Sequence, residues 1–324
     1  MTRLPFACLA LSMVLTLAAD VRAFCRARTC EPSHPTEDCG IDDHGCTTVG
    51  RLLRWNTGCV TFAVQKDGSH RSGIDIDSAL DASSRALAAW LLVDCAGKKP
   101  SLTGASLGPV TCDESRYDPN GGNANIVIFR DDDWPYPGGN DLFATTVVRF
   151  DPATGEILDA DIEINTATFL VSATGGNVGV DLQSILSHEF GHFLGLAHSG
   201  VDTTMQANWD GVGTALRSLS EDDAAGMCDA YPPGREARAS CTPGHGFSSE
   251  CAAARVEPGD AGCMLAHAPH RREDGSAPAI AIVLAFGVAL RRAGRVTCRR
   301  RCTGFERMSS SIAECGRDHV VGST

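Results

Sequence analysis

The sequence predicts an α/β domain of the mixed α+β kind, and two observations predict it. Between residues 51 and 233, short apolar runs that are separated by turn residues occur together with longer stretches whose apolar residues recur at helical spacing. The composition, with 43% hydrophobic and 21% charged residues, is that of a globular protein with a real core. We take residues 51–233 as one domain, which is long enough to bury that core.

The first part of the domain reads as strands and one helix. Alternation of apolar residues predicts a strand over Trp55–Val64. An apolar stripe predicts a helix over Ile74–Val93, with Asp75 or Asp77 able to cap its start. The segment between Cys95 and Cys112 is predicted to be a loop. Three further strands are predicted, over Asn125–Phe129, Ala144–Phe150 and Ile157–Ile164.

Two helices complete the predicted domain. The first spans Asp181–Leu194, with Asp181 as the N-cap residue. The second runs from Ser220 to Tyr231, with Ser220 as N-cap and acidic residues in its first turn, where the helix dipole favours negative charge. Pro232-Pro233-Gly234 ends it.

The first of these helices carries the pattern H-E-x-x-H-x-x-G-x-x-H over residues 188–198. Residues four apart share one face of a helix, so His188 and His192 can hold one ion together. Gly195 can adopt a left-handed conformation that ends the helix and brings His198 back as a third ligand. Glu189 can reach a water on the ion without binding it. Three imidazoles with one open position predict a catalytic zinc site.

The cysteines and the N-terminus predict secretion. Fifteen cysteines without a CxxC metal pattern are typical of an oxidising compartment. Residues 1–23 read as a signal peptide, with Arg3, an apolar run from Leu4 to Ala19, and a cleavage site at Val21-Arg22-Ala23; the run is short for a membrane anchor. Residues 24–50 are then a Cys-rich extension tied by disulfides, without a core of their own.

The net charge and the C-terminal residues limit the classes of partner that we expect. A net charge of −12 argues against nucleic acid as a partner. Residues 234–276 read as a Cys-containing linker, and residues 277–324 as a short apolar segment, Ala277–Leu290, followed by a basic tail. This arrangement resembles sorting tails of bacterial surface proteins, which implies transient membrane association. As a helix the apolar segment rises only about 21 Å, which favours the alternative of a poorly ordered tail.

Residues outside the zinc motif indicate more closely which kind of zinc site the motif forms. They are Ser199, Met205, the run Leu219–Asp223 with Tyr231, and the upstream run Asp159–Asn165. Together with the eleven-residue string, these residues resemble the matrixins, the metzincin family that includes the matrix metalloproteinases. The resemblance covers roughly residues 53–232. It implies a zincin-like domain with a twisted mixed sheet, an active-site helix and a C-terminal helix.

The resemblance also implies roles for the site residues. His188, His192 and His198 would bind one catalytic Zn²⁺, and Glu189 would act as general base. Met205 would form an apolar floor beneath the ligands. Some metzincins carry a tyrosine ligand two residues after this methionine, and here that position is Ala207, so three histidines are the expected protein ligands.

Protein or peptide substrates are the implied partners. An extended peptide would pair with the edge strand of the sheet through backbone hydrogen bonds. Ala144–Val148 is the predicted edge, with Ala144 and Thr145 as the substrate-binding residues.

The sequence departs from the family in three places. No histidine lies between Arg71 and Ser187, so we do not expect the second, structural zinc of matrix metalloproteinases. The acidic runs Asp131–Asp133 and Asp151–Glu163 read as solvated turns and a polar strand face, with Ca²⁺ binding as the alternative. Cys39 is expected in a disulfide and not as the cysteine that confers latency in the family. For the other cysteines, Cys95–Cys112 and Cys241–Cys251 are candidate local pairs, with connectivity left open.

The function predicted from these residues is a secreted zinc-dependent metalloendopeptidase, either released or held at the cell surface. Two alternatives are a processing protease of narrow specificity and a disulfide-rich surface or adhesion protein that uses a metzincin scaffold for binding. The intact Glu189 argues against the last, because a binding scaffold has no need of a general base.

Overall fold

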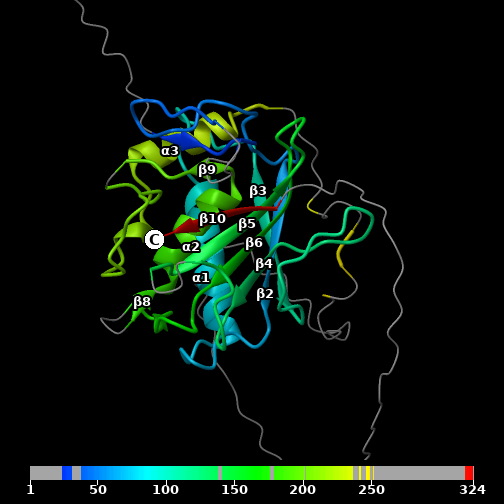
Figure 1. Ribbon diagram of the computed structural model, residues 1–324, viewed down its shortest axis with the longest axis vertical. Coiled ribbons are helices and arrows are strands. Elements are labelled where there is room, and N and C mark those ends of the chain that lie inside the picture. The colour runs from blue at the N-terminus through cyan, green and yellow to red at the C-terminus, as the bar shows by residue number, and fades with distance from the viewer. Residues whose placement is uncertain are drawn as a thin grey trace, which may run out of the picture. The chain divides into compact units, whose positions relative to one another are not determined.

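A six-stranded mixed sheet forms one layer of the protein, with the strand order β10-β5-β6-β4-β2-β3. Strands β3, β2, β4 and β6 run parallel, and β5 and β10 are antiparallel to their neighbours, as Figure 1 shows. The strands of the sheet are β2 Cys59–Gln65, β3 Thr103–Val110, β4 Ile126–Phe129, β5 Ala144–Phe150, β6 Ile157–Ile164 and β10 Asp318–Ser323. The short strands outside it are β1 Cys25–Arg26, β7 Val171–Ser172, β8 Val180–Asp181 and β9 Leu196–Ala197.

The computed structural model describes residues 24–30, 38–137, 141–175, 179–200, 202–235, 241, 246–248 and 251, together with the backbone of 318–323. The predicted signal peptide and the segment Ala277–Leu290 lie outside the described residues. Within the described part of the chain, no helix is long and apolar enough to cross a bilayer.

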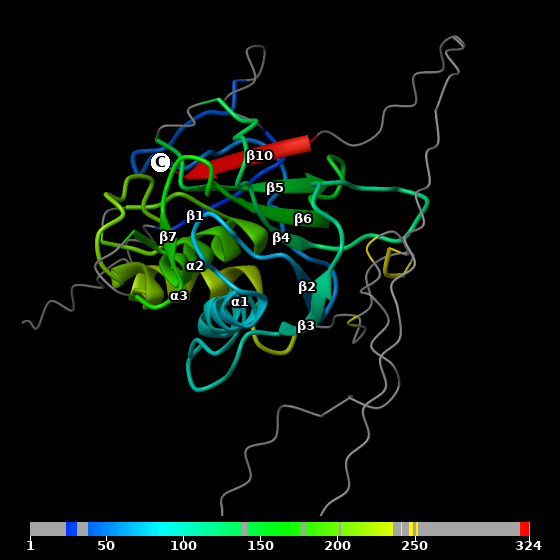
Figure 2. The same ribbon diagram turned by 90° about the horizontal axis from the view of Figure 1, so that it is seen from below.

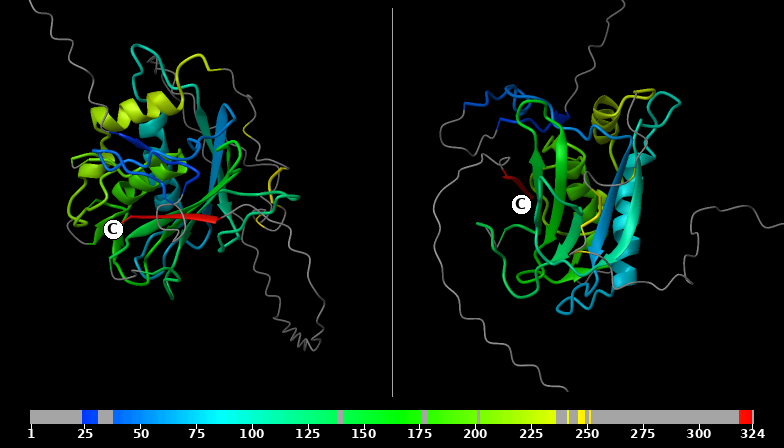
Figure 3. Two further views of the ribbon diagram at one scale, coloured as in Figure 1. Left: turned by 45° about the horizontal axis from the view of Figure 1, so that its top comes forward. Right: turned by 90° about the vertical axis from the view of Figure 1, so that its right-hand side faces the viewer.

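The helices lie on one face of the sheet, as Figures 2 and 3 show. They are α1 Ile76–Leu91, α2 Leu182–Phe193, α3 Glu221–Ala230 and the short 3-10 helix η1 Ala215–Arg217. Trp90 of α1 is fully buried and donates its indole N–H to the Ser187 carbonyl of α2, 2.8 Å away. Phe62 of β2 meets Phe190 of α2 edge to face. The core therefore lies between the sheet and the two long helices, and it fixes α2 in place.

Most predicted elements are confirmed. Strands β5 and β6 have the predicted bounds, and α1 begins after Asp75, whose carboxylate accepts a hydrogen bond from the Ser78 amide. The prediction of a loop before Cys112 was wrong, because residues 103–110 form β3 beside β2. Its apolar pattern is weak because β3 lies at the outer edge of the sheet with only its last residue buried. Backbone pairing with β2 forms this strand.

Disulfides tie the N-terminal extension to itself. Cys25 bonds to Cys46, and Cys30 bonds to Cys39. The expectation that Cys39 is in a disulfide is confirmed.

Three other disulfides join segments far apart in the sequence: Cys59–Cys241, Cys95–Cys228 and Cys112–Cys251. The predicted local pairs Cys95–Cys112 and Cys241–Cys251 were therefore wrong. The extended strand β3 runs between Cys95 and Cys112, and eight extended residues separate their ends by about 26 Å. Cα atoms in a disulfide lie within about 7 Å of each other.

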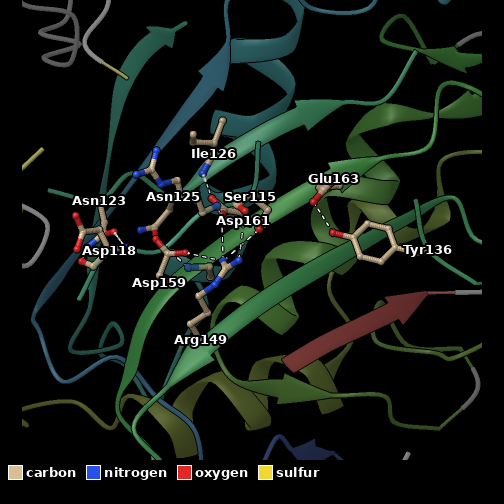
Figure 4. Close-up of polar contacts among 12 residues, drawn as sticks. Ser115, Asp118, Asn123, Asn125, Ile126, Tyr136, Arg149, Asp159, Asp161 and Glu163 are labelled. Atoms are coloured by element: carbon tan, nitrogen blue, oxygen red, sulfur yellow. Dashed lines mark hydrogen bonds and ion pairs between the residues drawn. The ribbon is translucent and has the colours of Figure 1, made fainter. Parts of the chain in front are cut away.

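The face of β6 away from the helices carries a buried acidic pair (Figure 4). Arg149 of β5 reaches Asp159 at 3.1 Å and Asp161 at 3.2 Å. Asp161 also accepts hydrogen bonds from the Ile126 amide and the Ser115 hydroxyl, both at 2.9 Å. These buried carboxylates therefore link β4, β5 and β6 to the loop that contains Ser115.

One guanidinium faces two carboxyl groups in this cluster, and the carboxyl groups lie within hydrogen-bonding reach of each other. Burial and the neighbouring Asp161 raise the pKa of Asp159 well above its ordinary value, and burial raises the pKa of Asp161 to about 6. Two buried carboxylates with one cation between them favour holding a proton. The pair therefore retains a proton into the mildly acidic range.

We predict that this pair makes stability depend on pH. Because the folded pKa values are raised, the folded state binds more protons than the unfolded state between about pH 4 and pH 6, and the free energy of unfolding falls as the pH rises through that window. Asp159→Asn should flatten this decline and leave stability at pH 7 equal or higher. Arg149→Met, which leaves both carboxyls without their cation, should lower the free energy of unfolding by about 3–5 kcal/mol.

Urea unfolding of chelator-treated, disulfide-intact protein from pH 4 to pH 8 measures both effects without interference from metal release. The exposed Asp132→Asn is the matched control and should change stability by less than about 0.5 kcal/mol. An identical decline in wild type and Asp159→Asn would contradict the shared proton.

Candidate metal centre and active site

Three histidines bring their ring nitrogens together at the end of α2. The Nε2 atoms of His188 and His192 are 3.1 Å apart, and each lies 3.2 Å from Nε2 of His198. Among the described residues, these three form the one group of three or more His, Cys, Asp or Glu side chains whose ligand atoms converge on a point. The sequence therefore identified the whole cluster.

Hydrogen bonds at the opposite nitrogens orient two of the rings. Nδ1 of His188 lies 2.7 Å from the Thr204 carbonyl, and Nδ1 of His192 lies 3.0 Å from the Leu196 carbonyl. Because a carbonyl only accepts, each Nδ1 carries the proton and each Nε2 presents a lone pair. Burial lowers the pKa of His188 to about 3, with His198 adding to the shift, and burial lowers the pKa of His198 to about 4. These rings are neutral at physiological pH, as metal ligands must be.

The cluster fits zinc. Zinc holds imidazole nitrogens at about 2.0–2.1 Å in tetrahedral geometry, which places neighbouring nitrogens about 3.3–3.4 Å apart. The observed 3.1–3.2 Å separations are close to this value. The donors are three nitrogens without a carboxylate, a set that suits zinc better than the oxygen-seeking Ca²⁺ or Mg²⁺.

Gly195 makes the turn that brings the third histidine back. Its φ is +86°, and a Cβ at this position would collide with the Leu53 carbonyl oxygen. The last carbonyls of α2 have side-chain donors: Trp55 Nε1 donates to Phe193 at 2.8 Å, and the Tyr231 hydroxyl donates to Leu194 at 2.9 Å. The predicted left-handed glycine is confirmed, and the helix end beside it is held by residues from both ends of the domain.

The N-terminal extension supports the loop that carries His198. Strand β1 pairs with β9, which comes directly before that histidine. Arg26 is buried and donates to the carbonyls of Leu53, at 2.7 Å, and Gly195, at 3.3 Å, and it forms an ion pair with Asp229 at 3.0 Å. Sequence reasoning missed this role, because a single arginine in a Cys-rich segment gives no signal of a partner so far along the chain.

Met205 packs against α2 beside Gly191. It is buried, and Gly191 of α2 leaves the space that it fills, since a Cβ there would collide with the methionine sulfur. Its carbonyl accepts from the Ser199 amide at 2.8 Å, which closes the loop after His198. Its role as a floor beneath the histidines stays a prediction.

Asp223 of α3 holds the loop that contains Met205. Its buried carboxylate accepts from the Thr204 amide at 2.8 Å and from the Met205 amide at 3.2 Å. The Thr204 carbonyl in turn orients His188. The sequence placed Asp223 within a matrixin-like run, but its hydrogen bonds to the loop beside the histidines are visible only in the fold.

Glu189 lies on the side of α2 that faces β5. It is fully buried, and the Thr146 hydroxyl of β5 donates to its carboxylate at 2.6 Å. Thr146 was not among the predicted site residues. It stands next to Thr145, whose side chain must point to the opposite face of the sheet because side chains alternate along a strand.

Ala144 and Thr145, the predicted substrate-binding residues, lie at the start of β5, and both are buried. The edge that we predicted at β5 is covered, since β10 pairs along it. Beside the start of β5 lies an open cavity of about 910 Å³ that borders the loop after Met205. Its lining consists of Asp141, Phe143, Phe169, Gln206, Asn208, Trp209 and Asp210.

Comparison with known proteins finds similarity over part of the chain. The family model for matrixin peptidases matches residues 116–232. This segment is similar to the matrixins. The chain is 31% identical to stromelysin-3 of Xenopus laevis over 127 residues and 33% identical to metalloendoproteinase 2-MMP of Arabidopsis thaliana over 98 residues. These matches cover 38% and 30% of the chain and a quarter of each relative. The family is one of zinc metalloproteases.

We predict that Asp223 contributes to metal affinity through the loop that it holds. Asp223→Ala should weaken zinc binding about 10- to 100-fold, because the carbonyl that orients His188 loses its support. Titration against a competing chelator, with circular dichroism to check folding, measures this effect. Ser220→Ala is the matched control: it removes the N-cap side chain of α3, at about 1 kcal/mol, but keeps the bonds of Asp223 to Thr204 and Met205. Equal zinc affinity in wild type and Asp223→Ala would contradict the prediction.

Proposed function

We propose that this protein is a secreted zinc-dependent endopeptidase in which Glu189 is the general base. The observation that carries the proposal is the convergence of three imidazole Nε2 atoms beside a carboxylate held by Thr146. Five disulfides support secretion, because such bonds persist in oxidising compartments. The matrixin match supports peptide or protein substrates.

The proposed roles of the side chains follow from their positions. A bound zinc ion would supply Lewis acidity toward the scissile carbonyl and lower the pKa of a water toward about 7. His188, His192 and His198 would hold the ion. Glu189 would take a proton from the attacking water and deliver it to the leaving amine. Thr146 donates to this carboxylate, and we infer that it fixes the rotamer of Glu189 as a positioning residue.

We further propose that an extended substrate pairs with β5 at Ala144 and Thr145. A backbone ladder would hold the peptide independently of its sequence, and pockets would select side chains. The cavity beside Phe143 is the candidate pocket. Phe143 makes edge-to-face contacts with Phe169 and Trp209, which gives the cavity an aromatic wall suited to an apolar substrate side chain.

The test of the proposed function is Glu189→Ala. The variant should keep its zinc, because Glu189 is not among the converging ligand atoms, and should lose at least 10²- to 10⁴-fold in kcat. Zinc content measured by elemental analysis, with hydrolysis of casein and of a broad peptide library followed by product sequencing, checks both statements. Glu221→Ala, an exposed glutamate on α3, should leave hydrolysis unchanged. A zinc-loaded wild type that cleaves nothing in the library would favour a binding module on a metzincin scaffold.

Thr146→Val tests the positioning of the base. Loss of the hydroxyl leaves the carboxylate of Glu189 without this donor, and we expect kcat to fall about 10-fold or more with little change in KM, because no predicted substrate contact is altered. Thr146→Ser keeps the hydroxyl and should restore most of kcat. A proportional loss of stability and activity in both variants would show that Thr146 is only a packing residue.

A further inference from the structure

Residues 318–323 of the chain form β10, an added strand on the outer side of β5 (Figure 1). The two strands are antiparallel and pair from Asp318 opposite Arg149 to Ser323 opposite Ala144 without a break in register. The other side of β5 is paired with β6. Both edges of β5 are therefore in use, and β10 holds the edge to which we assign the substrate.

The direction of β10 brings it across the proposed active site. Its last residues lie opposite the start of β5: Val321 faces Thr146, and Gly322 faces Thr145. The Thr146 hydroxyl holds the carboxylate of Glu189, so this part of β5 lies beside the catalytic base. The strand also comes close to α2, the helix that carries the first two histidines. An intramolecular strand thus lies at the positions that a substrate backbone needs.

The backbone groups along one edge of a strand can pair with only one neighbouring strand at a time. Each residue of β5 has one N–H and one C=O group, and on this side of the strand those groups can pair with either β10 or a peptide. Substrate binding at Ala144 and Thr145 then requires β10 to leave, at least over its last residues. Competition between the two follows from the geometry alone.

The sequence of β10 suits this position. Asp318-His319-Val320-Val321-Gly322-Ser323 has adjacent β-branched valines and no proline, so every residue can donate to a ladder. Because β10 belongs to the same chain, its pairing is intramolecular, and such tethers act at effective concentrations up to about millimolar. A free peptide substrate must overcome that concentration.

We propose that residues 318–323 are a built-in inhibitor that occupies the substrate edge of β5 and must be displaced or removed before cleavage. The proposal rests on the proposed peptidase function for its consequence, though not for the placement of the strand. The apparent affinity for substrate is reduced by the fraction of molecules in which the edge is open. If β10 covers the edge in about nine molecules of ten, its removal raises kcat/KM about 10-fold.

The first measurement concerns the strand and not the activity. Hydrogen–deuterium exchange of the β5 amides is compared in the full chain and in a chain that ends at Arg317, both in the Glu189→Ala background so that self-cleavage cannot remove the segment. We expect faster exchange at residues 144–148 in the shortened chain. In the full chain, Val321→Pro should give the same increase, because a proline in the middle of the strand distorts the backbone that pairs with β5. Replacing Thr303–Met308 by a Gly-Ser sequence of the same length is the control and should leave exchange unchanged.

The second measurement is kinetic, with Glu189 intact. An internally quenched peptide chosen from the cleaved library reports kcat/KM for the full chain, the chain ending at Arg317, Val321→Pro and the Thr303–Met308 replacement. We expect a rise of about 10-fold in the second and third, mostly in KM. A synthetic peptide with the sequence of residues 318–323 should inhibit the shortened chain competitively, and a scrambled peptide of the same composition should not.

The outcomes separate this proposal from the proposed function. Unchanged exchange on removal of residues 318–323 overturns the placement of β10 at this edge, whatever the activity. Faster exchange with equal kcat/KM in all forms overturns the inhibitory role. Faster exchange in protein that hydrolyses nothing, shortened or not, leaves the strand in place, overturns its role as an inhibitor of cleavage, and rejects the peptidase function itself.

Discussion

The left-handed turn at Gly195 is the constraint on which the site depends. Two of the three converging ring nitrogens come from successive turns of α2, and the third can join them only if the chain reverses directly after the helix. The carbonyl oxygen of Leu53 occupies the space where a side chain at residue 195 would be, so the reversal and its packing both require glycine. Trp55, Tyr231 and Arg26 then supply donors to the carbonyls exposed around the turn. A helix end in a buried site needs such partners, and this domain draws them from segments as far apart as residues 26 and 231.

A series of hydrogen bonds also connects α3 to His188. Asp223 belongs to the capping box that starts α3, and the same carboxylate binds the amides of Thr204 and Met205. One side chain therefore links the start of a helix, the backbone of Met205 and the residue whose carbonyl sets the tautomer of His188. An acidic residue can be buried here because its carboxylate oxygens accept hydrogen bonds. Each of these hydrogen bonds orders part of the site. On the other face of the sheet, Arg149 of β5 forms ion pairs with Asp159 and Asp161 of β6. These ion pairs hold the two strands together.

The features predictable from sequence were those set by local rules. The bounds of α2, its cap at Asp181 and the convergence of the three histidines follow from spacing and helix chemistry, and β5 and β6 follow from apolar alternation. The misses share a physical cause. Strand β3 is stabilised by its neighbour more than by its own pattern, and Cys95 finds Cys228 because β3 carries Cys112 away from it. Thr146 and Arg26 act through partners 43 and 169 residues distant, which no local pattern encodes.

The β3 and β5 edges of the sheet differ in how readily their backbone groups can pair with another chain. The β3 edge is largely exposed and contains a proline, features that discourage further pairing. The β5 edge is the opposite: every residue of β5 is buried, and its sequence, Ala-Thr-Thr-Val-Val-Arg-Phe, is rich in β-branched residues. A peptidase that recognises backbone needs such an edge, and the same edge invites pairing with any extended chain. Cys39, the residue nearest to a family latency motif, is committed to a disulfide with Cys30. Strand β10 covers this edge and shields β5 from other chains, and under the proposed function it is also the strand that a substrate would have to replace.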